Sequence, residues 1–201
     1  MNFCAVNMMP KTPILLLHLI GLCLAIGPVL IMDLRLFRLL LGNPVRRTDI
    51  DLAAFLAPWV RAGLLLLWVS GAGFLLHYAF NTPEALSNPK LHAKLLVVAI
   101  LTTNGMLVER YAFVQLTVRE GLPLLDPADR RQRLALLTIG AVSAMSWYTS
   151  LLLGVVRELN FACEAWILLS LYALSTAFMF SGLWVITHFG CRTWVVGRLA
   201  G

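Results

Sequence analysis

Charged residues are what this sequence has least of. Only 13% of its 201 residues are Asp, Glu, Lys or Arg, whereas about a quarter of an ordinary soluble domain is charged. Hydrophobic residues make up 60% of the chain, and the mean hydropathy is +0.83. The apolar excess is too large and too evenly spread to form one soluble core. The composition therefore excludes a water-soluble globular protein and indicates a polytopic membrane protein.

The short motifs of many soluble enzymes are also absent. The chain has no Cys-x-x-Cys pair, no Cys-x-x-Cys-His for covalent haem, no Gly-x-Gly-x-x-Gly and no Walker loop. Its four cysteines are scattered. These absences exclude the common nucleotide-binding loops and c-type haem attachment.

Long apolar runs are what the sequence does have. A helix needs about 20 apolar residues to cross a hydrocarbon core, and five stretches are long enough: residues 14–34, 59–80, 90–110, 132–156 and 163–187. The first run exceeds the usual signal-peptide core and no small-residue cleavage site follows it, so we expect it to be a span. We expect an all-α fold, in which residues 1–201 form a single domain of five transmembrane helices.

Capping residues mark the expected helix starts independently of hydropathy. Asn88-Pro89 and Asp126-Pro127 each combine a capping side chain with a proline that presets the first helical φ angle. Thr48 to Asp51 resembles a capping box, with Asp in place of the usual Glu. This pattern predicts that the second helix begins before its membrane span.

The basic residues are distributed unequally between the two sides of the predicted bundle. One side, which carries the N-terminus, holds four of the 16 Lys and Arg residues, and the other side, which carries the C-terminus, holds the remaining 12. Cytoplasmic loops are enriched in Lys and Arg. We therefore expect a multi-pass protein whose N-terminus lies outside and whose C-terminus lies in the cytoplasm.

Three of the four histidines fall at a similar depth on the predicted outer side, namely His18, His77 and His92. At about 100° per residue, each stands on a helix face that is rich in small or polar residues. Such faces pack inward in membrane bundles. The faces contain Gly21, Ala25, Val29 and Met32 with His18; Gly73, Ser70, Gly63 and Trp59 with His77; and Ala99, Thr103, Met106 and Arg110 with His92.

Inward histidines beside small residues suit a flat macrocycle between helices. Neutral imidazole is a good ligand for haem iron, so two of the three histidines are candidate axial ligands. Lys94 is a candidate partner of a haem propionate, and the nearby alternatives are Lys90, Arg157 and Lys11. The competing interpretation is structural: the histidines are hydrogen-bonded polar groups, Lys94 extends to the headgroups, and Asn104 bonds a neighbouring helix.

A second metal hypothesis begins in the N-terminal tail. Met1, Cys4, Met8 and Met9 precede the helix that carries His18, and soft sulfur ligands select Cu(I). Copper handling by the three histidines and this tail is the alternative to haem.

Three segments carry a resemblance to a known family. Residues 18–35, which run from His18 to Arg35, resemble the opening helix of a group of uncharacterised bacterial inner-membrane proteins, which are related to the CopD copper-resistance membrane domain and, more distantly, to the HemJ protoporphyrinogen oxidases. Residues 88–96 look like the start of their third helix, where His or Phe followed by Lys-Leu recurs. Residues 140–147 look like their following helix.

The resemblance implies a helical bundle in the bacterial inner membrane that holds haem b through histidines on the first and third helices. Those positions match His18 and His92, with His77 as a competing ligand. We therefore expect a haem b-binding or redox-linked protein with the quinone pool or other redox membrane proteins as electron partners. The alternatives are a CopD-like copper-handling protein and an accessory subunit without a cofactor. The chain departs from HemJ proteins in its longer tail and in having His77, and it has fewer spans than full-length CopD.

Overall fold

The computed structural model describes the backbone of residues 11–199 and the side chains of residues 11–188. Over the described residues the chain is 86% helical, and five of the helices there are long and apolar enough to cross a membrane. The prediction of an all-α membrane bundle is confirmed. The elements are α1 (Lys11–Leu40), α2 (Arg47–Asn81), η1 (Pro83–Ser87), α3 (Pro89–Leu107), η2 (Val108–Ala112), α4 (Phe113–Val118), α5 (Arg130–Val155), η3 (Arg157–Leu159) and α6 (Ala165–Leu199).

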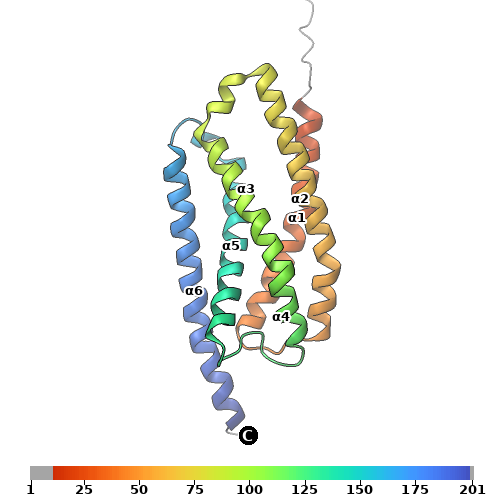
Figure 1. The fold of residues 1–201 in the computed structure, drawn as a ribbon, viewed down its shortest axis with the longest axis vertical. Helices are drawn as coiled ribbons and strands as arrows, with labels where there is room; N and C mark the ends of the chain where they lie inside the picture. Colours follow the sequence, from red (N-terminus) through yellow and green to blue (C-terminus); the bar gives the residue numbers. More distant parts are fainter. Residues whose placement is uncertain (1–10, 200–201) are drawn as a thin grey trace, which may run out of the picture.

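The helices alternate in direction between two ends of the bundle (Figure 1). The upper end, as drawn, carries the start of α1 and the connections that contain η1 and η3. The lower end carries the connections α1–α2 and α4–α5. The third span is continuous from Pro89 to Val118, with a π-helical turn, η2, between α3 and α4.

The bundle has two parts. The hairpin of α1 and α2 is one part, and α5 packed against both α3 and α6 is the other. At the lower end the two connecting loops form β-bridges, Pro44 with Pro123 and Val45 with Glu120. A cluster that includes Leu39, Val45, Leu124 and Leu137 is buried there. The two parts are therefore joined most firmly at the lower end.

Small residues bring the two helices of the hairpin into backbone contact. A Cβ atom added at Gly63 would lie 2.6 Å from the carbonyl oxygen of Gly21 and 2.7 Å from the nitrogen of Ala25. Such close approach is how membrane helices gain van der Waals contact, because lipid tails give no hydrophobic driving force between helices. The predicted inward faces of His18 and His77 do meet here.

Helix starts follow local capping only in part. Asn88 caps α3, since its side chain accepts a hydrogen bond from the Lys90 nitrogen. α2 begins at Arg47, ahead of its apolar core, with the Asp49 side chain accepting from the Arg46 nitrogen. The capping box therefore starts at Arg46, two residues before the predicted Thr48. The predicted start of α5 at Asp126-Pro127 is wrong, because Asp129 is the N-cap.

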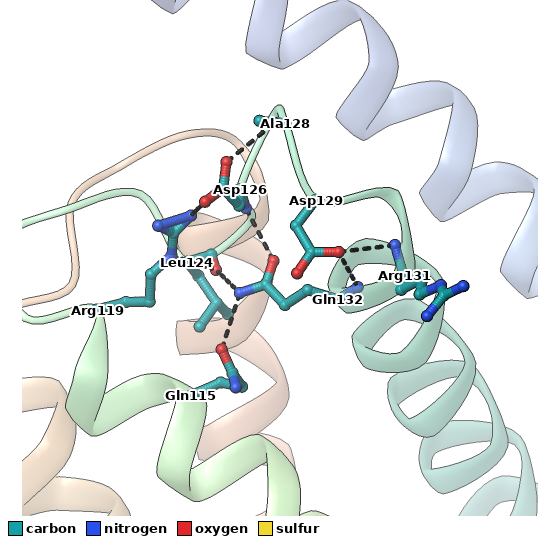
Figure 2. A network of polar contacts seen from close by, with 8 residues as sticks. All are labelled: Gln115, Arg119, Leu124, Asp126, Ala128, Asp129, Arg131 and Gln132. Carbon is teal, nitrogen blue, oxygen red and sulfur yellow. Dashed lines mark hydrogen bonds and ion pairs between the residues drawn. The ribbon is translucent and has the colours of Figure 1, made fainter.

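Asp126 belongs instead to a polar network at the lower end (Figure 2), where its carboxylate pairs with Arg119 at 2.9 Å. The centre of the network is the buried Gln132. Its Oε1 accepts from the Asp126 nitrogen at 2.9 Å, and its Nε2 donates to the Leu124 carbonyl at 3.0 Å and to Gln115 Oε1 at 3.1 Å. Gln132 thus ties the α4–α5 loop to both neighbouring helices.

Replacing Gln132 by leucine is expected to lower the free energy of unfolding by about 2 kcal/mol, because the Asp126 N–H and the Leu124 carbonyl lose a partner in a buried site. The Gln115→Leu variant is the matched control, since it removes one bond and leaves the loop contacts of Gln132 in place. Denaturation in detergent measures both. Equal losses in the two variants would contradict the central role of Gln132.

Candidate functional site

His18 lies on α1 and faces α2. Its Nδ1 is 2.8 Å from Ser70 Oγ, and its ring stands edge-on to Phe74 with centroids 5.6 Å apart. Ser70 Oγ is also 2.6 Å from the Leu66 carbonyl oxygen, which accepts the single hydroxyl proton of Ser70. Ser70 Oγ then accepts from the Nδ1–H of His18. The lone pair of the neutral ring is therefore on Nε2.

His77 is buried on α2, nearly two turns beyond Ser70. Its Nδ1 lies 3.4 Å from Nδ2 of Asn81, which also donates to the His77 carbonyl at 3.0 Å. His188 is exposed near the lower end. The structure thus separates His188 from the other histidines, as the sequence predicts.

His92 does not lie where the face analysis places it. The prediction that its face packs inward is wrong, because that face of α3 is exposed along its length: His92, Ala99, Thr103, Met106 and Arg110. The buried face is about a quarter turn or more away and contains Lys90, Ala93, Val97, Leu101 and Asn104. Asn104 donates to the Ile139 carbonyl at 3.0 Å, which confirms its predicted role between helices.

The predicted haem ligands do not fit the group as a pair. Nδ1 of His18 is bonded to Ser70, which leaves Nε2 for a metal, but His92 lies on the exposed face of α3. Among the described residues, no group of three or more His, Cys, Asp or Glu side chains is placed to hold a metal ion. Met1, Cys4, Met8 and Met9 of the copper hypothesis lie outside the described residues. Ligation by His18, His77 or His92 stays a prediction.

A mainly apolar enclosure lies elsewhere, between the α1–α2 hairpin and the α3–α5–α6 part. It is a cavity of about 520 Å³ that extends from Trp68 and Trp147, in the middle of the bundle, to Asp49 and Leu124 at its lower end. No histidine lines it. Its size and its mainly apolar lining are typical of a small-molecule site.

One side of the cavity is lined by residues of α2 and α3, which scarcely contact each other. Two polar links cross this seam: Trp68 Nε1 donates to Thr102 Oγ1 at 3.0 Å, and Arg61 Nε lies 3.3 Å from Glu109 Oε1. The links are seven residues apart on each helix, or about 10 Å. Between them α3 carries Gly105, which lines the cavity and has no side chain to close it.

Charged groups gather at the lower end of the cavity. Arg35 Nη1 lies 3.6 Å from Oδ1 of the buried Asp49. The half-buried Asp33 also lines the cavity and makes no hydrogen bond or ion pair with another described residue. The lower end therefore offers a ligand both a guanidinium donor and a carboxylate acceptor.

Sequence reasoning missed this cavity because it arises from the relative placement of two helix groups. Arg35 pairs with Asp49 and not with Asp33, its near neighbour in the sequence. Two features of the sequence could have indicated the cavity: a carboxylate near the end of one span, and a glycine, Gly105, within another span.

No family model matches this chain, and no curated protein or solved structure matches it either. The resemblance to CopD and HemJ proteins therefore stays a prediction that rests on residues 18–35, 88–96 and 140–147.

Proposed function

We propose that this membrane protein binds a prenylated quinone, or its quinol, in the cavity between the α1–α2 hairpin and the α3–α5–α6 part. The observation that carries the proposal is the combination of an apolar enclosure of about 520 Å³ with a donor and an acceptor at one end. A quinone ring accepts hydrogen bonds through its carbonyls, and a quinol donates them through its hydroxyls. Arg35 suits the first form and Asp33 suits the second.

The charges around the cavity favour a neutral headgroup. Arg35 pairs with Asp49 and Arg61 pairs with Glu109, so only the carboxylate of Asp33 remains unpaired among these groups and the two signs nearly cancel. A strongly anionic or cationic headgroup would have no matching excess of charge. The apolar walls above this end then accommodate the first part of an isoprenoid tail.

The ligand reaches the cavity from the bilayer through the seam between α2 and α3. The two polar links lie about 10 Å apart along the helices, and this spacing exceeds the width of a six-membered ring. A lipid-soluble molecule needs no route through water. This entrance supports a ligand that is delivered by the membrane itself.

The proposed setting is the bacterial inner membrane, with the lower end of the bundle in the cytoplasm. The excess of Arg residues at that end supports the orientation. The headgroup site then lies near the cytoplasmic surface. The geometry favours quinone binding over haem b or copper ligation, because the cavity contains no histidine and His92 is exposed.

Binding is tested by tryptophan fluorescence of the purified protein in nanodiscs. Trp68 and Trp147 line the cavity, so decylubiquinone is expected to quench them saturably. A tail-only molecule, dodecane, is expected not to quench. Quenching that only follows partitioning of quinone into lipid, without saturation, would favour the cofactor-free accessory subunit instead.

The Asp33→Asn variant tests the headgroup assignment. Because a hydrogen bond to a charged acceptor contributes about 1.5–3 kcal/mol, decylubiquinol is expected to bind about 10- to 100-fold more weakly. Decylubiquinone, which has no hydroxyl to donate, is expected to change by less than about threefold. Asp51→Asn on the exposed side of α2 is the matched control, and equal losses for both redox forms would refute the role of Asp33.

A further inference from the structure

Like Asp33, a second charged group makes no ion pair with another described residue. It lies at the upper end, away from the cavity. Lys94 is on the inward side of α3, and its Nζ lies 3.4 Å from the position that a Cβ atom on Gly154 of α5 would take. Gly154 itself is exposed. The glycine therefore leaves room for the ammonium group beside an exposed position of α5.

Among residues 11–188, no counter-charge pairs with Lys94. It makes no hydrogen bond or ion pair with another described residue, and the groups that act on it electrostatically are Lys90, of like sign, and His18. Lys90 is already satisfied, because its Nζ donates to the Val156 carbonyl and, at 3.1 Å, to Asn160 Oδ1. An unpaired cation within a membrane bundle is expensive, and such residues commonly mark functional sites.

Ser150 supplies a second unmatched polar atom on the same side of α5. It lies one turn before Gly154, so the two share a helix face. Its Oγ is buried and has no hydrogen-bond partner in the described part of the chain. One turn earlier, the hydroxyl of Ser146 donates to the Val142 carbonyl, so a serine on this helix can be satisfied by its own backbone, and Ser150 is not.

We propose that Lys94 and Ser150 bind an anionic group of phosphate or carboxylate chemistry at the upper end of the bundle. The ammonium supplies the charge and the hydroxyl supplies a second donor, and both suit the oxygens of such an anion. Gly154 is exposed, so an anion can approach Lys94 beside it. This inference is independent of quinone binding, since its residues do not line the cavity.

The test uses the whole protein in nanodiscs of phosphatidylcholine, titrated by calorimetry with inorganic phosphate and separately with acetate. We expect saturable binding of at least one anion, weakened about tenfold or more in Lys94→Met and restored in Lys94→Arg. Ser150→Ala is expected to weaken it about threefold to tenfold. Lys11→Met removes an exposed lysine at the same end and is expected to have no effect.

A second arm distinguishes a lipid headgroup from a free anion. If neither phosphate nor acetate binds, phosphatidylglycerol added to the nanodiscs is expected to raise the thermal midpoint of the wild type and of Lys94→Arg, but not of Lys94→Met. The folded state of each variant is checked by circular dichroism. The proposal is overturned if Lys94→Met binds as the wild type does, or if neither arm responds in the wild type.

Discussion

The Gly63→Ala variant is expected to lose about 3 kcal/mol of unfolding free energy, at the upper end of the range for overpacked sites. The new methyl group would lie 2.6 Å from the Gly21 carbonyl oxygen and 2.7 Å from the Ala25 nitrogen. Both atoms belong to the backbone of α1, so no side chain can rotate away. The two helices would have to separate over the whole contact, which also carries the hydrogen bond between His18 and Ser70.

Gly71→Ala on the same helix is the matched control. A Cβ atom there meets nothing within 4 Å, so this variant is expected to be neutral or stabilised by up to about 1 kcal/mol through helix propensity. Chemical denaturation in detergent measures both variants. If the two changes agree within about 0.5 kcal/mol, the close packing of the α1–α2 hairpin does not stabilise the protein.

The same hairpin shows why sequence reasoning succeeded for part of the fold. The runs of apolar residues determine the five spans, and a face of Gly, Ala and Ser identifies the contact between α1 and α2 because small residues permit backbone approach. Asn104 was predicted correctly for a related reason. A buried amide needs a partner, and the nearest one available is the carbonyl of Ile139 on the adjacent helix.

The prediction for His92 failed because polarity is an ambiguous guide on a membrane helix. Thr103 was counted as evidence for an inward face, but its hydroxyl donates to the Ala99 carbonyl on its own helix at 3.0 Å. A threonine whose hydroxyl is bonded to its own helix can face lipid, because it leaves no unpaired donor. The buried face is instead set by tertiary contacts, and these include Lys90, which reaches the Val156 carbonyl at the end of α5.

The start of α5 and the cavity were missed for a different reason, because both depend on contacts between distant segments. Asp126 has the local features of an N-cap, but Arg119 and Gln132 hold it within a loop. The cavity exists because α2 and α3 scarcely contact each other, so a space is left between the two helix groups. Neither contact has a signature in a single run of sequence.

A side chain added at Gly105 is expected to fill part of the cavity between α2 and α3. The Gly105→Leu variant is expected to weaken decylubiquinone binding by about 100-fold or more, while the free energy of unfolding stays the same or rises. Gly105 lies between the two polar links of the α2–α3 seam, and a Cβ atom added there meets nothing within 4 Å. A leucine side chain occupies the space of three or four buried ligand carbons, each worth about 0.8 kcal/mol, which corresponds to a loss of that size.

Gly182→Leu is the matched control for this variant, because Gly182 on α6 is also free of neighbours within 4 Å and lies outside the cavity. It is expected to bind decylubiquinone as the wild type does. If the Gly105→Leu protein is folded and decylubiquinone still quenches its tryptophan fluorescence with wild-type affinity, the quinone binds elsewhere. Loss of binding in both variants would instead indicate a general effect of an added leucine. Only loss confined to Gly105→Leu assigns the ligand to the cavity, because that substitution adds a side chain to the cavity wall at a position where a Cβ atom meets nothing within 4 Å.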